Sequence, residues 1–432
     1  MAEEVLAASK TLASAERVKS LRALPGVLPW WGLILAFLFA AMAVISRKPE
    51  LVFNAQFIAD EGLWFADAYQ NGALHCILQP QAGYLCVASK LPIFLALYVP
   101  LVYAPVVFGL CAACVHALMA VFLLTTRLAS VGNLRPRILL FFLWIIVPNV
   151  SEIDSLNNTQ WMLAALGIAI LLSSPPMTVL WRIFDLLSIS LISLTGPFCI
   201  LLFPLAVAWW ILRRKKWILV LASILAAGFL VQALTLSHSL NTCTPKDIFS
   251  PLLLRLLAGQ IFMFGTLNGG NILPHATLET QGVTVLATLV VVAGLSIAVY
   301  TLMKAPLELK LFIVFAGLVT VSAIRRLHCL PGWDWSSMMT VDYAIRYWFV
   351  PRLAVLATLV WMIGRERPMW ARSASAIAIL LLTSSAIRHW QYSATPYQDF
   401  RRYASDFEHT AKGTQFSIPV NPPGWRIILV KH

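Results

Sequence analysis

Charged residues are scarce in this chain. They make up 12% of its 432 residues, and the mean hydropathy is +0.79. Soluble globular domains usually have about 25% charged residues, which cover their surface. The scarcity of charge therefore excludes an ordinary soluble protein and indicates a chain that lies in a membrane.

The long apolar stretches also lack the alternation of apolar and polar residues that marks the strands of a membrane barrel. They are continuous runs, and those of about 18 residues or more are long enough to cross a hydrocarbon core about 30 Å thick. Lipid offers no hydrogen-bond partners to the backbone, and a helix satisfies its own backbone groups. The sequence thus predicts an all-α polytopic membrane protein.

Eleven transmembrane spans are expected from these runs. They divide the chain into a cytoplasmic N-terminal segment 1–27, a transmembrane domain 28–387 with a long external loop 47–103, and an external C-terminal tail 388–432. The spans are placed near residues 28–46, 104–126, 138–149, 161–175, 184–195, 198–212, 217–236, 283–302, 311–325, 346–364 and 373–387.

The basic residues set the expected orientation. Lys and Arg outnumber Asp and Glu by 32 to 19, and many of them gather in short loops such as residues 213–216. The positive-inside rule puts these short loops in the cytoplasm and the long connections, which hold most of the acids, outside. This placement explains the net charge of +13 without a nucleic-acid partner.

Metal motifs and fixed-period repeats are also lacking. Cys111 and Cys114 have CxxC spacing but lie inside an apolar run, where packing is expected. Cys76 and Cys86 lie in the external loop, where an oxidising compartment would allow a disulfide, but spacing does not decide the pairing. No cofactor is predicted; a divalent metal is compatible with the sequence but nothing indicates one.

Two adjacent carboxylates, Asp60 and Glu61, follow the first span. Asp60, Trp64 and Asp67 have the spacing i, i+4 and i+7, which places them on one face of an amphipathic helix suited to the membrane interface. A solvated surface helix would show the same spacing. Ionisable groups near the end of a membrane span are costly and tend to be functional, which favours a site here.

A second group of polar residues occupies the next external connection. Glu152 and Asp154 are followed by Asn158 and Gln160 at the start of the fourth span. Amide and hydroxyl groups at such an entrance suit the many hydroxyls of a sugar. The same residues also suit a polar cap on a helix N-terminus, and both interpretations stay open.

Arginines on the outer side oppose the positive-inside rule. Arg326 ends one span and Arg346 opens the next. A guanidinium binds phosphate through two parallel hydrogen bonds, so an anionic partner is one hypothesis. Snorkelling towards lipid headgroups is the other.

Residues 60–92 resemble the first external loop of the membrane-embedded GT-C glycosyltransferases, which include lipid A aminoarabinose transferases and protein O-mannosyltransferases. That loop has an Asp-Glu pair after the first helix, then an alanine and a glycine, then a lysine before proline. One proline follows the lysine here after an intervening leucine, whereas the family often has two directly after it. The matching residues are Asp60-Glu61-Gly62, Ala66 or Ala68, Gly72 and Lys90-Leu91-Pro92.

Three further stretches resemble bacterial members of the family that modify O-antigen and related surface glycans. They are Leu194-Thr195-Gly196-Pro197, the IRYWFVP stretch that contains Arg346, and IPVNPPGWRIILVKH near the C-terminus.

The resemblance implies transfer of a sugar from a polyprenyl-phosphate donor to a glycan or lipid-linked acceptor, on the periplasmic face of the bacterial inner membrane. It makes 47–103 the catalytic loop, with Asp60 as general base and Glu61 assisting. Lys90, Arg326 and Arg346 would bind the donor phosphate. The sugar or acceptor would be bound by Asp67, His75, Glu152, Asp154, Asn158 and Gln160.

Three other functions are compatible with the sequence. A transporter or flippase of lipid-linked sugars would place polar groups near the bilayer midplane and often has two related halves. An O-antigen polymerase or ligase would centre on a large external loop late in the chain. A structural membrane subunit needs no site.

Overall fold

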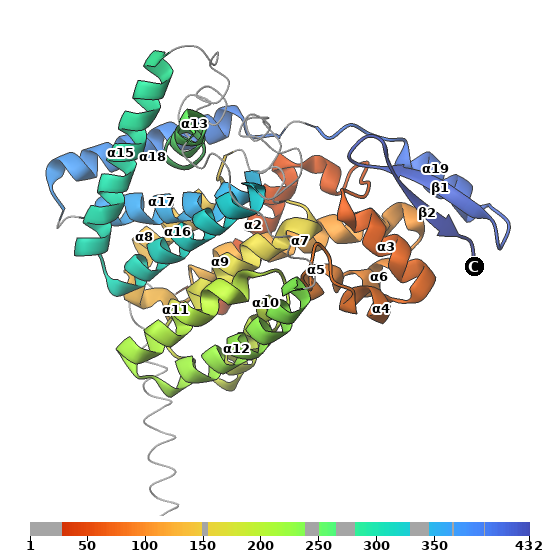
Figure 1. Ribbon diagram of the computed structural model, residues 1–432, viewed down its shortest axis with the longest axis horizontal. Helices are drawn as coiled ribbons and strands as arrows, with labels where there is room; N and C mark the ends of the chain where they lie inside the picture. The colour runs from red at the N-terminus through yellow and green to blue at the C-terminus, as the bar shows by residue number, and fades with distance from the viewer. Residues whose placement is uncertain are drawn as a thin grey trace, which may run out of the picture.

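The computed structural model describes residues 28–148, 154–237, 250–264, 281–328, 345–364, 367–392 and 394–432. The predicted cytoplasmic segment 1–27 lies outside them. The described residues form a bundle of helices and one two-stranded sheet (Figure 1). This confirms the prediction of a helical protein.

Seven helices among the described residues are long and apolar enough to cross a membrane, so the chain is a multi-pass helical membrane protein. Short 3-10 turns precede two of them, η2 (Leu101–Tyr103) and η7 (Ile345–Trp348). The seven are α2 (Trp30–Arg47), α7 (Ala104–Phe122), α12 (Lys216–Ser237), α15 (Gln281–Lys304), α16 (Leu307–His328), α17 (Phe349–Met362) and α18 (Met369–Arg388).

The other four predicted spans fall on shorter helices of 12 to 16 residues. At 1.5 Å per residue these are about 18–24 Å long, less than a hydrocarbon core of about 30 Å. Eleven full crossings therefore stay a prediction. The four helices are α8 (Leu134–Ile145), α9 (Thr159–Leu172), α10 (Val179–Ser193) and α11 (Phe198–Arg213).

Helix α9 is the centre of the bundle. Every residue from Thr159 to Leu172 is buried, and α7, α10, α11, α16 and α17 pack around it. A helix enclosed on all sides has no solvated face, which explains why its sequence is apolar all round. Helix α15 stands at the edge of the bundle, and only 11% of its most apolar window is buried (Figure 1).

The first external loop folds into four short helices at one end of the bundle. Its first helix confirms the helix predicted from the spacing of Asp60, Trp64 and Asp67, but Trp64 is buried and the two acids are only partly so. The helices are α3 (Asp60–Asn71), α4 (Ala73–Leu78), α5 (Val87–Lys90) and α6 (Ile93–Ala96).

A helix that the sequence did not predict lies in segment 237–282, which was predicted to be external. Helix α13 (Pro251–Leu257) continues into a π-helical turn, η5 (Ala258–Phe262). The fully buried Arg352 of α17 donates from Nε to the Gln260 carbonyl oxygen at 2.7 Å and thereby ties η5 to the bundle. A local change of helix type is common near functional sites.

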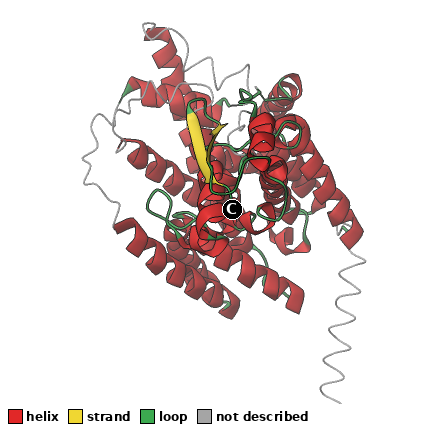
Figure 2. Cartoon of the chain, turned by 90° about the vertical axis from the view of Figure 1, so that its right-hand side faces the viewer, coloured by secondary structure: helices red, strands yellow, loops and turns green. Residues whose placement is uncertain are grey.

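The predicted tail 388–432 is folded. Helix α19 (Phe400–Glu408) packs with an antiparallel hairpin of β1 (Gln415–Val420) and β2 (Trp425–Val430), in which Gln415 pairs with Val430. The hairpin lies against α3. It stands at one end of the helical bundle in Figure 1, and Figure 2 views the molecule from that end. We call α19, β1 and β2 the C-terminal module.

Apolar side chains of the C-terminal module and the first external loop share one core. Phe57, Trp64, Phe400 and Ile427 are all buried in it. The two parts of the chain therefore lie on the same side of the membrane, and an even number of crossings separates them. Eleven spans and seven both satisfy that condition.

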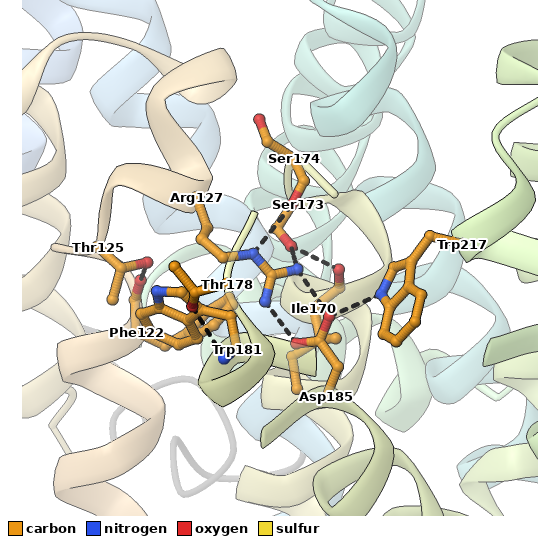
Figure 3. Close-up of polar contacts among 10 residues, drawn as sticks. All are labelled: Phe122, Thr125, Arg127, Ile170, Ser173, Ser174, Thr178, Trp181, Asp185 and Trp217. Carbon is orange, nitrogen blue, oxygen red and sulfur yellow. Dashed lines mark hydrogen bonds and ion pairs between the residues drawn. The ribbon is translucent and has the colours of Figure 1, made fainter. Parts of the chain in front are cut away.

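A buried ion pair closes the opposite end of the bundle (Figure 3). Arg127, in the turn η3 (Thr126–Val131), meets both carboxylate oxygens of Asp185 on α10, with Nη2 at 2.9 Å from Oδ2. Nη2 also donates to the Ser173 hydroxyl at 2.7 Å, and the Trp217 indole donates to Asp185 at 2.8 Å. These four residues, the Arg127 cluster, link the ends of α9, α10 and α12.

Candidate functional site

Asp60 and Glu61 are neighbours in sequence, but their carboxylates meet different surroundings. Both stand in the first turn of α3, where negative charge is favoured by the helix dipole. The chain enters this turn through Ala59, whose φ is +51°. Adjacent residues of a helix point in different directions, so only one of the two carboxylates is half-exposed.

The Glu61 carboxylate is enclosed by protein. Its side chain is 4% exposed and accepts hydrogen bonds from the backbone N–H groups of Ile58, at 3.1 Å, and Leu156, at 2.6 Å. Burial raises its pKa to about 7, against the effect of these bonds and of Lys48. Glu61 therefore joins the first external loop to the turn before α9.

The Asp60 carboxylate is half-buried and accepts one hydrogen bond, from Gln81 Nε2 at 3.1 Å. Burial raises its pKa above 3.8, while the positive charges of Arg346 and Lys90 oppose the rise. Asp60 thus has electrostatic partners from two distant parts of the chain.

Tyr84 and Gln160 lie beside the same group. Burial raises the pKa of Tyr84 to about 12, whereas a side-chain hydrogen bond with Gln160 and the charge of Arg346 act to lower it. Gln160 is buried at the start of α9, and its Oε1 accepts no hydrogen bond within the described residues. We call Asp60, Gln81, Tyr84, Gln160 and Arg346 the Asp60 cluster.

The Leu194-Thr195-Gly196-Pro197 turn supports the loop that carries Gln81 and Tyr84. Gly196 N donates to the Leu85 carbonyl oxygen at 2.8 Å, and Ala88 N donates to the Thr195 hydroxyl at 2.8 Å. Gly196 has φ +74°, and a Cβ there would lie 2.2 Å from Gln160 Oε1. The turn therefore requires glycine both for its backbone conformation and for the space that Gln160 occupies.

Lys90 is close to the Asp60 cluster but is fully buried. Its Nζ donates to the backbone carbonyls of Cys76, at 2.9 Å, and Gln79, at 2.8 Å. It also lies 5.5 Å from the centre of the Trp64 ring. Lys90 caps the C-terminal end of α4 and acts on Asp60 through its charge.

Asp154, predicted to bind sugar or acceptor, lies in the protein interior. Its Oδ1 is 2.9 Å from Nδ1 of His116 on α7, and both side chains are 1% exposed. This pair joins the turn before α9 to the centre of α7. No sequence pattern indicated this pair, because His116 stands alone in an apolar run.

The other predicted binding residues are distributed around the loop. Asn158 is buried and donates to the Ser155 hydroxyl at 3.1 Å, within its own turn. Asp67 and His75 form a separate partly exposed pair, 3.9 Å apart, and Asn71 donates to Asp67 at 2.7 Å. Of the predicted set, the structure brings Asp60, Gln160 and Arg346 together.

Some predictions lie outside the described part of the chain. Glu152 is among these residues, and so is the side chain of Arg326. Cys76 and Cys86 are both described, and both are free and buried, so the structure does not contain the disulfide that the sequence left open.

Gln81 and Tyr84 are the site residues that sequence reasoning missed. Both lie between the Asp60-Glu61 pair and Lys90, in a polar stretch without a motif. Their place follows from the way residues 81–84 turn back, with Gln81 N donating to the Tyr84 carbonyl oxygen at 2.8 Å.

Chemically, the Asp60 cluster combines a carboxylate that can take a proton with a guanidinium that can bind an anion. The amide of Gln160 and the phenol of Tyr84, which the Arg346 charge also influences, add hydrogen-bonding groups. Among the described residues, no three His, Cys, Asp or Glu side chains are grouped to hold a metal ion. The sequence matches no protein-family model, and neither curated proteins nor solved structures give a match.

Proposed function

We propose that this chain is an integral membrane glycosyltransferase. It transfers a sugar from a polyprenyl-phosphate donor to a lipid-linked or surface glycan acceptor, with inversion. The bacterial inner membrane is the proposed location, with the N-terminus in the cytoplasm and the Asp60 cluster and C-terminal module in the periplasm. Eleven helices take part in the transmembrane domain.

One observation carries this proposal: Arg346 and Asp60 lie within electrostatic range of each other although they are far apart in the sequence. A base for a hydroxyl and a cation for a departing phosphate are the two groups that the reaction needs side by side. The surrounding apolar bundle suits a donor whose lipid chain stays in the bilayer.

The reaction follows from these roles. Asp60 takes the proton of an acceptor hydroxyl as its oxygen attacks the anomeric carbon of the donor sugar. The bond between that carbon and the phosphate oxygen breaks, and polyprenyl phosphate leaves with the electron pair. Arg346 stabilises the charge that develops on the phosphate.

The residues around these two groups have supporting roles. Gln160 and Tyr84 offer hydrogen bonds to sugar hydroxyls, and the buried Gln160 Oε1 accepts no hydrogen bond within the described residues. Lys90 and Glu61 position the loop, since each is held by two backbone hydrogen bonds. Raising the pKa of Asp60 by burial brings its basicity closer to that of a useful base.

The test is Asp60→Asn in the full-length protein, reconstituted in liposomes with a panel of polyprenyl-phosphate sugars and extracted surface glycan. We expect release of polyprenyl phosphate to fall by about 10²–10⁴-fold, the usual contribution of a general base. Unfolding temperature in detergent should not fall, because Asn keeps the shape of the side chain.

The matched control is Asp406→Asn, which removes an exposed carboxylate from α19 in the C-terminal module. It should leave transfer at the wild-type rate. Full activity of Asp60→Asn would show that Asp60 is not the base, and equal loss in both variants would show that the effect does not come from this site.

A further inference from the structure

An apolar cavity of about 230 Å³ lies among α7, α8, α9, α16 and α17. Its wall is made of aliphatic and aromatic side chains, including Leu140, Ala165, Ala169, Phe312 and Val360. An engineered apolar cavity of about 150 Å³ in another protein stays dry and takes up benzene, so this one is large enough for a hydrocarbon chain.

The cavity is separate from the Asp60 cluster. Helix α9 contributes Gln160 to the cluster from its first turn and Leu172 to the cavity from its last residue. The segment that begins with Arg346 likewise reaches the cavity at its far end, through Ala357, Val360, Trp361 and Gly364. The cavity therefore occupies the half of the bundle that ends at the Arg127 cluster.

Basic residues line this end of the cavity or lie within three residues of its lining in the sequence. The Arg367 guanidinium lies 4.0 Å from the centre of the Trp361 ring, which forms part of the wall, and Arg137 lines the cavity itself. Arg135 and Lys304 are exposed close by in sequence to lining residues. Glu308 is the one carboxylate among the lining residues in the described part of the chain. Its Oε1 lies 2.8 Å from Nη2 of Arg213.

We propose that this cavity binds an acyl chain of an anionic phospholipid, with the lipid phosphate among Arg367, Arg135 and Lys304. The apolar wall accounts for the chain and the excess of positive charge accounts for the anionic headgroup. A membrane supplies such a lipid directly to a cavity between helices. The site is independent of the proposed transfer reaction, since it uses none of the groups of the Asp60 cluster.

The ligand must have both an apolar chain for the cavity and a negative headgroup for the cations. A zwitterionic phospholipid with the same chains fits the apolar wall but has no net negative charge for the cations, so it should bind more weakly. Inorganic phosphate satisfies the cations but leaves the cavity empty. The preference for an anionic headgroup therefore depends on Arg367, and the binding of any chain depends on the free volume beside Ala169.

Native mass spectrometry of the full-length protein in detergent tests this, with phosphatidylglycerol and phosphatidylcholine of identical acyl chains as probes. We expect wild type to retain phosphatidylglycerol several-fold more than phosphatidylcholine. Arg367→Gln should bring that ratio close to one, whereas Arg372→Gln, which removes an exposed arginine from α18, should leave it unchanged.

Ala169→Phe, which fills the cavity, should remove one bound phospholipid of either kind. Its control, Ala293→Phe, adds the same ring to an exposed position of α15 and should retain that lipid. Equal retention of the two phospholipids by wild type would overturn the proposal, and so would undiminished binding by Ala169→Phe. If Ala169→Phe does not fold, the proposal is overturned when Arg367→Gln retains phosphatidylglycerol over phosphatidylcholine in the same ratio as wild type.

Discussion

The Arg127 cluster and the Asp60 cluster each combine an arginine with an aspartate, at opposite ends of one bundle. In the Arg127 cluster the two charges touch, are almost fully buried, and are hydrogen-bonded on every side by Ser173, Ser174 and Trp217. In the Asp60 cluster both charged residues are half-exposed, and among the described residues Asp60 accepts one side-chain hydrogen bond.

The difference separates two uses of the same residue types. A buried charge pair whose members are hydrogen-bonded to each other holds helix ends together and cannot be reached by a ligand. Charges that influence each other while they are partly exposed can be reached by a ligand. Removing a carboxylate should therefore cost stability at one end and activity at the other.

The largest expected effect on stability is that of Asp185→Ala. It leaves the buried Arg127 guanidinium without its counter-charge, and breaking a buried pair in this way costs about 3–5 kcal/mol. The measurement is the free energy of unfolding in mixed detergent micelles. A variant as stable as wild type would contradict the role assigned to the Arg127 cluster.

The double variant Arg127→Met with Asp185→Leu is the control. It removes both charges and fills their volume, so most of the lost stability should return. Polyprenyl phosphate release by the double variant should equal that of wild type, because the Arg127 cluster lies far from the Asp60 cluster.

Arg346→Gln tests the half-exposed Asp60 cluster. Losing a cation that stabilises developing charge on phosphate should lower the rate of transfer by about 10²–10³-fold. Because Arg346 opposes the rise in the pKa of Asp60, its loss should raise that pKa further. The acidic limb of the pH–rate profile should then move to higher pH, since the base works in its ionised form.

Snorkelling of Arg346 to lipid headgroups makes a different prediction. Arg346→Gln would then change neither the dependence of the rate on donor concentration nor the acidic limb of the profile. Arg346→Lys keeps a positive charge without the planar fork, so it should restore the position of the acidic limb more fully than the rate.

Glu61 is a third kind of carboxylate: it is buried like Asp185, but its hydrogen-bond partners are backbone N–H groups. Burial raises its pKa from 4.5 to about 7, so the folded state holds the proton more tightly than the unfolded state. Its contribution to stability is therefore complete below pH 4.5 and is lost as the pH rises through about 7.

The pKa difference corresponds to about 3 kcal/mol. Wild type should lose about that much unfolding free energy between those two pH values, and Glu61→Gln should not. The same pH dependence in both proteins would assign the effect to another group.

The sequence was a reliable guide to the elements and to part of the site. Long apolar runs predict membrane helices because lipid leaves the backbone no alternative, and the spacing around Asp60 predicts α3 for a similar local reason. The grouping of Arg346 with Asp60 was a hypothesis from topology and from the family resemblance. Its support in the structure is the effect of the Arg346 charge, which opposes the rise in the pKa of Asp60.

What the sequence could not provide were contacts between distant segments. Asp185 lies within a predicted span and has no sequence pattern that pairs it with Arg127. Lys90 is of a residue type that binds phosphate, but its Nζ donates to two backbone carbonyl oxygens. The different surroundings of Asp60 and Glu61 depend on side-chain directions, which a pair of adjacent acidic residues in a sequence does not specify.

The contact between the C-terminal module and the first external loop has a consequence for the order of events during synthesis. Ala59 N donates to the Asn421 carbonyl oxygen at 2.6 Å, and Asn421 N donates to the Phe57 carbonyl oxygen at 3.1 Å, directly before Asp60. A ribosome that adds about 5–20 residues per second completes this contact roughly 20–70 s after it has made α3. Until residues 400–430 reach the same side of the membrane, the apolar face of α3 stays uncovered, so the support directly before Asp60 is among the last parts of the molecule to form.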